Sequence, residues 1–320
     1  MTPAFDAKAC ANYFHAFGFL KLPGFFSSQE MSAISTEFDN TIEAAYGELS
    51  RERNYLLAQF IDLNQNLSSL LTHPKLNLII EALLGKNFLY KGSDGNVFRK
   101  STGWHRDYLI RNKSCKVLIY LQGSSGDSSA LRVIPGTQFV NDRFSSTVGN
   151  ALCWPEQPFQ GGFDEFNIFG EGHDPTTLGM NRTLPQIVVA NNPGDIIIFN
   201  HNLIHCTNAT QSASTRRLLG LHFVRNPLEH PMRELRESLY DELKELCLIE
   251  MKAFNLSKMF GHATHEHKSP LIQRMIEPLR DLRLDINTEF NGTFSSQTGD
   301  SICFCNRLKI TDTLNATLLN

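Results

Sequence analysis

The feature that most limits the possible folds is a series of short segments rich in β-forming residues between residues 88 and 224. Clusters of Gly, Ser and Asp separate these segments, and we find no helical pattern between them. The segments cover residues 88–90, 96–98, 116–121, 131–134, 187–189, 195–199 and 217–224. A parallel α/β sheet needs a helix between successive strands, so this pattern predicts an antiparallel sandwich or a jelly roll (double-stranded β-helix).

Helical patterns flank this β-rich region. The spacing predicts a helix from Ser27 or Ser28 to about Tyr46, a second over roughly 67–84, and leucine-spaced helices over roughly 232–260. A short strand is expected at 19–22. We therefore expect one domain over residues 1–320, with a helical N-terminal part (1–85), a jelly-roll core (86–226) interrupted by an insertion (141–185), and a C-terminal helical extension (227–320).

Composition narrows the class of partner. The formal net charge is -3 and no long basic run occurs, so neither nucleic acid nor an anionic membrane surface is indicated. No stretch approaches the ~20 apolar residues of a membrane span, and the N-terminus does not have the pattern of a signal peptide. Seven scattered cysteines fit a reducing cytoplasm. The C-terminal leucine spacing leaves open whether those helices pack on the core or form a homodimer contact.

The motif G-W-H-R-D-Y (residues 103–108) places an imidazole and a carboxylate two positions apart. On a strand these side chains share one face, so His105 and Asp107 converge while Arg106 points away. A third ligand is expected from His201 or His205, which follow the β-forming run 195–199. Two histidines and one carboxylate with three open positions form the facial triad of non-haem Fe(II) oxygenases.

The open positions suit a 2-oxo acid, which chelates two of them, and dioxygen, which takes the third. The second carboxylate of 2-oxoglutarate requires a buried cation, and the planar fork of arginine binds a carboxylate bidentately. Arg216 and Arg217 lie at the start of the next strand. Alternation puts Arg216 and His222 on one face and Arg217 on the other.

With these motifs the chain resembles the phytanoyl-CoA dioxygenase-like family of Fe(II)/2-oxoglutarate oxygenases over roughly residues 12–226. The matching segments are F-G-F-L-K-L-P-G-F-F-S-S-Q-E, G-W-H-R-D-Y, K-V-L-I-Y-L, A-L-R-V-I-P-G-T and G-D-I-I-I-F-N-H-N-L-I-H-C-T. The resemblance implies Fe(II) held by His105, Asp107 and His205, which leaves His201 as a non-ligand. It also implies that Arg216, helped by Thr207, holds the distal carboxylate of 2-oxoglutarate.

The implied reaction is hydroxylation of a C–H bond with succinate and CO2 as co-products. Asp107 stands where halogenating relatives have a small residue, so halogenation is disfavoured. The near-neutral net charge of the chain and its aromatic-rich insertion favour a natural-product or amino-acid-derived metabolite as substrate. Desaturation, cyclisation or a fatty acyl-type substrate stays open. Two other classes are alternatives. A jelly-roll isomerase or lyase would not need Arg216, and a non-catalytic binding protein would not need the full set of five site residues.

Further residues are candidates for the pocket. On the strand before the H-x-D motif we assign Asn96 to 2-oxoglutarate and Arg99 to the substrate. The insertion is long and rich in aromatic residues, so we expect it to cap the pocket, with Trp154 and Phe159 facing the substrate. The motif H-A-T-H-E-H (residues 262–267) suggests a second metal site, but a polar linker is the favoured interpretation.

Overall fold

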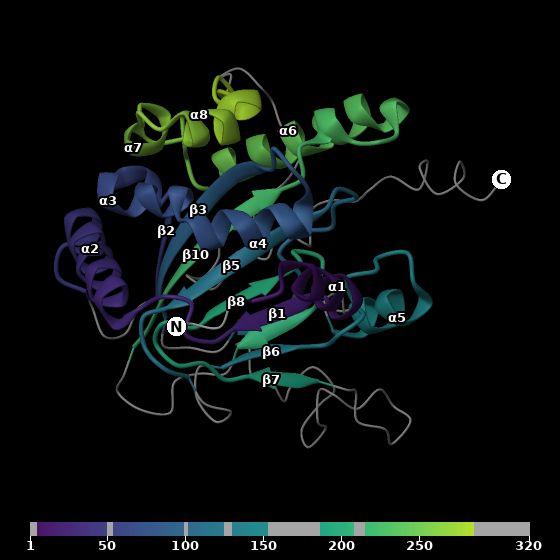
Figure 1. Cartoon of the computed structure of the whole chain (residues 1–320), viewed down its shortest axis with the longest axis horizontal. Coiled ribbons are helices and arrows are strands. Elements are labelled where there is room, and N and C mark those ends of the chain that lie inside the picture. Colours follow the sequence, from purple (N-terminus) through teal and green to yellow (C-terminus); the bar gives the residue numbers. More distant parts are fainter. Residues whose placement is uncertain are drawn as a thin grey trace.

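The computed structural model describes residues 5–49, 54–98, 102–124, 130–152, 186–207 and 215–284. Two antiparallel sheets form the centre of the molecule (Figure 1), a six-stranded sheet in the order β1-β8-β5-β10-β3-β2 and a four-stranded sheet in the order β4-β9-β6-β7. The strands are β1 Phe19–Leu22, β2 Tyr55–Ala58, β3 Leu89–Phe98, β4 Thr102–His105, β5 Ser114–Tyr120, β6 Leu131–Val133, β7 Ile187–Val189, β8 Ile196–Phe199, β9 His205–Thr207 and β10 Arg216–Val224. The predicted double-stranded β-helix is confirmed.

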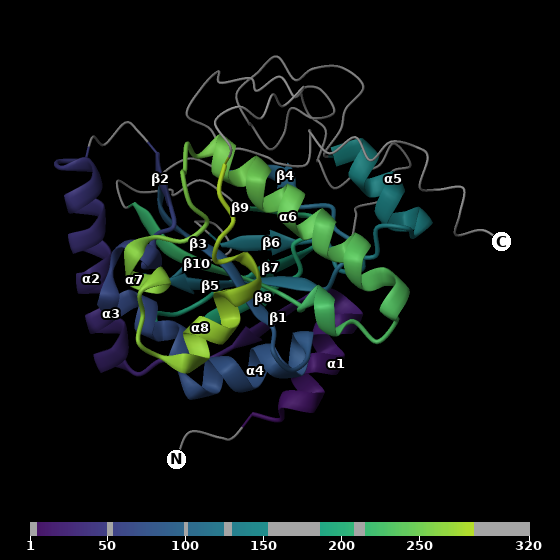
Figure 2. The same ribbon diagram turned by 90° about the horizontal axis from the view of Figure 1, so that it is seen from above.

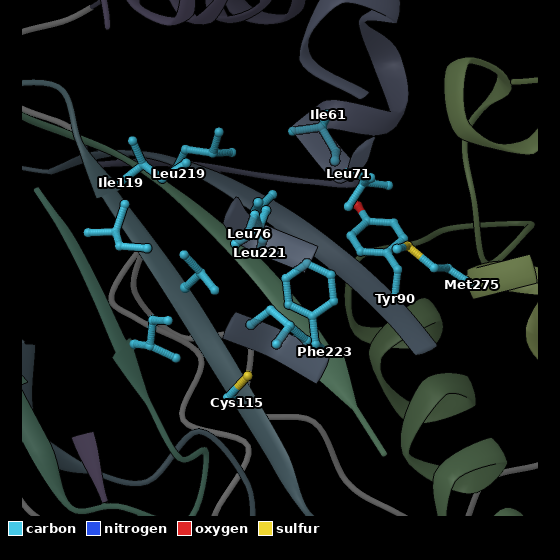
Figure 3. Packing of buried hydrophobic residues seen from close by; sticks show 14 of the residues in the cluster. Ile61, Leu71, Leu76, Tyr90, Cys115, Ile119, Leu219, Leu221, Phe223 and Met275 are labelled. Atoms are coloured by element: carbon cyan, nitrogen blue, oxygen red, sulfur yellow. The ribbon is translucent and has the colours of Figure 1, made fainter. Parts of the chain in front are cut away.

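Alternation along the strands of the larger sheet separates two cores. On β5, Val117 and Ile119 belong to a large cluster that includes helical residues, whereas Leu118 and Tyr120 belong to a smaller cluster between the two sheets. Figure 3 shows the outer face of this sheet, where residues of β5 and β10 pack against helical side chains such as Leu76. The inner face therefore lines the space between the sheets, and polar residues on that face point into it.

Helices cover the outer face of the six-stranded sheet. Helix α4 lies across it, and the four-stranded sheet lies on the opposite side (Figures 1 and 2). The helices are α1 Ala7–Phe17, α2 Ser28–Tyr46, α3 Gln65–Ser68, α4 Pro74–Leu84, α5 Arg143–Leu152, α6 Arg236–Ala253, α7 His262–His265 and α8 Pro270–Ile276. Helix α2 begins as predicted, because the Ser27 hydroxyl accepts from the Glu30 amide and the Glu30 carboxylate accepts from the Ser27 amide.

Three features differ from the sequence-based expectation. The helical first 85 residues contribute β1 and also β2, an edge strand that the sequence did not predict. Segments 88–90 and 96–98 are parts of one strand, β3, because β10 pairs with it on both sides of the glycine-rich stretch. The insertion begins with helix α5 rather than an irregular loop. Among the described residues, no helix combines the length and apolar character needed to span a membrane.

Candidate metal and co-substrate site

The pairing of β4 with β9 places His105 directly opposite His205. Their ring centroids are 4.3 Å apart. Asp107 follows β4, and its Oδ1 lies 3.7 Å from Nε2 of His105 and 3.6 Å from Nε2 of His205. One ligand atom from each of the three residues lies within 4.8 Å of the others. These distances leave room for one cation between the three side chains.

The protonation of His205 suits a metal ligand. Its Nδ1 lies 2.9 Å from the carbonyl oxygen of Leu203. A carbonyl only accepts, so Nδ1 carries the hydrogen and the lone pair is on Nε2, the atom that faces Asp107. Burial, followed by the charge of neighbouring His105, lowers the pKa of His205 to about 3. The imidazole is therefore neutral at physiological pH.

Asp107 is held as a carboxylate. Burial raises its pKa, but the charge of Lys116 and of the neighbouring histidines outweighs burial and keeps the pKa well below the usual range. Oδ2 has no hydrogen-bond partner among the described residues. Two imidazoles and one carboxylate are the donor set that non-haem Fe(II) prefers, so these residues fit the iron that the sequence predicts.

Arg106, between the two predicted ligands, points away from them as expected. It is 2% exposed. Its guanidinium donates to the backbone carbonyls of Thr137, Asn202 and Ser145. Thr137 ends the P-G-T turn, Asn202 lies in the segment before β9, and Ser145 lies in helix α5. Arg106 therefore ties together the segments that carry the ligands.

Arg216 lies at the start of β10 and is 1% exposed. As predicted, it shares the inner face with Leu218 and His222, and all three line one pocket together with the metal-site residues. Arg217 points to the other face, where it donates to Asp39. Burial lowers the pKa of Arg216, but a guanidinium stays charged in a protein. This pocket therefore contains the buried guanidinium of Arg216 together with the metal-site residues.

Two further residues predicted to bind 2-oxoglutarate also line this pocket. Thr207 lies on β9, and its hydroxyl is 2.6 Å from the hydroxyl of Thr102. Asn96 lies on β3 opposite Leu218, and its Nδ2 donates to Asp94 at 3.2 Å. Arg99, Trp154 and Phe159, the predicted substrate-facing residues, lie outside the described residues.

Tyr120 is a pocket residue that the sequence reasoning missed. It lies on β5, is 1% exposed, and its hydroxyl has no hydrogen-bond partner among the described residues. Burial raises the pKa of Tyr120, and the positive charge of Arg216 opposes that rise, so the two groups interact electrostatically. Alternation along K-V-L-I-Y could have identified it, because Tyr120 shares a face with Leu118. An unsatisfied hydroxyl next to a buried guanidinium suits a carboxylate ligand.

On the side of helix α6, the pocket contains a second group of buried charged residues. Lys91 is 2% exposed and donates to Glu250 of helix α6 and, at 3.0 Å, to the hydroxyl of Tyr108. Tyr108 in turn donates to Glu250. The hydroxyl of Tyr108 therefore belongs to a buried polar cluster with Lys91 and Glu250. No local pattern identified Glu250, which is 159 positions from Lys91.

The C-terminal region also adds apolar residues to the pocket wall. They are Met251, Phe254, Leu256 and Met259. The described part of the extension, residues 227–284, therefore packs on the core and contributes one wall of the pocket. His262 and His265 lie in α7, and among the described residues only His105, Asp107 and His205 form a group able to hold a metal ion.

Comparison with protein-family models identifies one family. Residues 14–218 match the family model of phytanoyl-CoA dioxygenase. No curated protein matches the chain. Among solved structures, the non-haem α-ketoglutarate-dependent carbocyclase SnoK from nogalamycin biosynthesis is similar, with a TM-score of 0.51 and 17% identity over 68% of this chain and 84% of SnoK.

Two other solved structures have the same degree of likeness. HygX from Streptomyces hygroscopicus, with nickel and 2-oxoglutarate bound, has a TM-score of 0.51 and 16% identity over 70% of this chain and 88% of HygX. The epimerase SnoN, in complex with Fe3+, α-ketoglutarate and nogalamycin RO, has a TM-score of 0.51 and 13% identity over 69% of this chain and 84% of SnoN. At these identities the likeness shows a shared fold.

Proposed function

Because this chain belongs to the phytanoyl-CoA dioxygenase family, we propose that it hydroxylates a C–H bond of a small-molecule metabolite, with succinate and CO2 as co-products. The family uses Fe(II), 2-oxoglutarate and O2. The observation that carries the proposal is the convergence of His105, Asp107 and His205 in the same pocket as the buried Arg216.

In this proposal His105 and His205 bind Fe(II) through Nε2, and Asp107 binds it through Oδ1. Asp107 Oδ1 lies 3.7 Å from Nε2 of His105 and 3.6 Å from Nε2 of His205. The hydrogen bond from His205 to Leu203 keeps the Nε2 lone pair free for the metal. A facial set of three protein ligands leaves the opposite face open.

Arg216 binds the distal carboxylate of 2-oxoglutarate, and Tyr120 and Thr207 donate hydroxyl hydrogen bonds to it. Arg216 and Gly220 are four residues apart on β10, about 13 Å at the usual rise of a strand. Lys116 packs over Gly220, and its Nζ lies 3.8 Å from Oδ2 of Asp107. The distal carboxylate would therefore bind at the Arg216 end of this strand, and the metal-site residues lie toward its Gly220 end. Asn96, opposite Leu218, lies between these two ends.

When iron and 2-oxoglutarate are bound, such a site couples decarboxylation of the ketoacid by O2 to oxidation of a substrate C–H bond. The chain's own residues hold the bound groups in position and exclude water from the pocket. Leu118, Leu131, Phe199 and Leu218 line the pocket between the sheets and keep it apolar around the polar groups. A dry site strengthens the electrostatic attraction between Arg216 and the carboxylate.

The substrate is proposed to bind between the metal site and the wall formed by α6 and the residues after it. Lys91 is paired with Glu250, and Lys116 with Asp94, so the charges in this part of the pocket compensate one another. Met251 and Phe254 add apolar surface. This composition favours a substrate whose buried part is uncharged, such as a natural-product or amino-acid-derived intermediate.

Desaturation or cyclisation would use the same residues with another substrate pose, and SnoK, a carbocyclase, has this fold. A jelly-roll isomerase or lyase would use the metal site without Arg216. The two classes are separated by succinate release from 2-oxoglutarate in the absence of substrate, with Fe(II) and ascorbate present. We expect slow release by the wild-type protein.

Arg216→Ala should weaken 2-oxoglutarate binding about 30-fold or more, because it removes one partner of a buried charge pair. Arg217→Ala is the matched control, since this neighbouring arginine points to the other face and donates to Asp39. No binding and no succinate release by wild-type protein would refute the oxygenase. Equal affinity in the two variants would refute the assignment of Arg216.

A further inference from the structure

The carboxylate of Asp107 has a defined orientation. Oδ1 faces Nε2 of both histidines, at 3.7 Å and 3.6 Å. Oδ2 faces away from them, and Lys116 Nζ lies 3.8 Å from it. The two oxygens thus lie in different environments, one between the imidazoles and one beside an ammonium group.

Lys116 is itself held in place by a second carboxylate. Its Nζ lies 2.8 Å from Oδ1 of Asp94, and both side chains are largely buried. Burial lowers the pKa of Lys116, but Asp107 and Asp94 outweigh burial and raise it above the usual value. The ammonium group is therefore charged and has a carboxylate on either side.

Gly220 permits this contact. Strand β10 lies between β5, which carries Lys116, and β3, which carries Asp94, so the two side chains meet over β10. A Cβ on Gly220 would lie 2.3 Å from Oδ2 of Asp94 and 2.6 Å from Cε of Lys116. A side chain at this position would therefore force the ends of both side chains to shift.

Asp94 also contacts a pair of histidines. Nε2 of His222 lies 3.5 Å from Oδ1 of Asp94, and Nδ1 of His222 lies 3.0 Å from Nε2 of His201. The two rings are stacked, with an interplanar angle of 9°. Burial lowers the pKa of both imidazoles. His201, the histidine that the family resemblance excluded as a ligand, thus belongs to the support of the site.

We propose that Lys116 is a positioning residue for Asp107. Held over Gly220 by Asp94, it attracts Oδ2 and so directs Oδ1 alone toward the metal. The carboxylate then occupies one coordination position, and three positions stay open for 2-oxoglutarate and O2. Without Lys116, Asp107 can rotate or bind through both oxygens. This inference rests on the metal site of the proposed function.

The test is metal affinity, measured by calorimetric titration of the chelator-treated protein with Mn(II). Lys116→Met removes the charge and keeps most of the volume. We expect its Kd to rise 10- to 100-fold, the usual effect of losing a group that orients a ligand. Lys21→Met is the control, because Lys21 on β1 is also paired with a largely buried carboxylate, Asp195, and does not line the pocket. Its Kd should equal that of the wild type.

Gly220→Ala tests the same arrangement without changing any charge, and it serves if Lys116→Met does not fold. It should also weaken Mn(II) binding. Gly95→Ala is its control, since a Cβ there would crowd the Phe60 ring at 2.2 Å, away from the ion pair. Equal Mn(II) affinity in wild type, Lys116→Met and Gly220→Ala would overturn the positioning role. Failure of the wild type to bind Mn(II) would instead overturn the metal site.

Discussion

Replacing Tyr120 by Phe should change stability and co-substrate affinity in opposite directions. The Tyr120 hydroxyl is buried and has no hydrogen-bond partner among the described residues. Burying an unsatisfied hydroxyl costs about 1–3 kcal/mol. Removing only that oxygen keeps the ring, which packs with Leu118 and Leu218 between the sheets. We therefore expect Tyr120→Phe to raise the free energy of unfolding of the ligand-free protein by about 1 kcal/mol.

Binding of 2-oxoglutarate should respond in the other direction. In the proposed complex the hydroxyl donates to a carboxylate that Arg216 also binds. A hydrogen bond to a charged group contributes about 1.5–3 kcal/mol, which corresponds to a Kd about 10- to 150-fold higher. The gain in stability and the loss of affinity come from the same oxygen, so a general disturbance of the pocket cannot produce both.

Urea denaturation gives the stability, and anaerobic calorimetric titration with 2-oxoglutarate in the presence of Mn(II) gives the affinity. Tyr90→Phe is the control, because the Tyr90 hydroxyl is also buried but donates to Asp62 at 2.7 Å, outside the pocket. This variant should lose stability and keep the wild-type affinity. A Tyr120→Phe protein that is less stable, or that binds 2-oxoglutarate as tightly as wild type, would refute the reasoning.

Three other predictions concern buried polar groups. Arg106→Met should lower the free energy of unfolding by about 3 kcal/mol or more, because three buried carbonyls lose their donor; a urea-denaturation loss below ~1 kcal/mol would contradict its structural role. Glu250→Gln should cost about 3–5 kcal/mol by leaving Lys91 buried without its carboxylate, and adding Lys91→Met should recover part of that loss in a double-mutant cycle. Burial raises the pKa of Asp62 to about 6, so the folded protein binds more protons than the unfolded chain between about pH 4 and 6, and stability falls as pH rises through that window. Asp62→Asn lacks this group, so its stability relative to wild type should rise by about 2 kcal/mol between pH 4 and pH 7, and a pH-independent difference in urea denaturation would contradict the shift.

Some properties of this protein follow from the sequence because they depend on local periodicity. Side chains alternate along a strand whatever it pairs with. That rule placed Arg216 and Arg217 on opposite faces of β10, and the structure shows one buried in the pocket and the other bonded to Asp39. The same rule turned Arg106 away from His105 and Asp107. Capping residues likewise determined where α2 begins.

Which histidine, His201 or His205, is the third ligand does not follow from the local sequence. Spacing left both histidines open, and only the resemblance to a family favoured His205. In the structure the register of β4 against β9 sets His205 opposite His105, while His201 contacts His222. Register depends on which strands pair across 100 residues of chain, so no pattern near either histidine contains it.

The supporting charges were decided by tertiary structure alone. Lys116 and Asp94 meet because β10 separates β5 from β3 and carries Gly220 between them. Lys91 meets Glu250 because α6 packs over the pocket. A lysine or glutamate in the sequence is usually a solvated surface charge, and only the assembled fold shows which ones are buried and paired. The sequence by itself therefore determined the ligand types and the faces they occupy, and the fold decided which distant groups hold them in place.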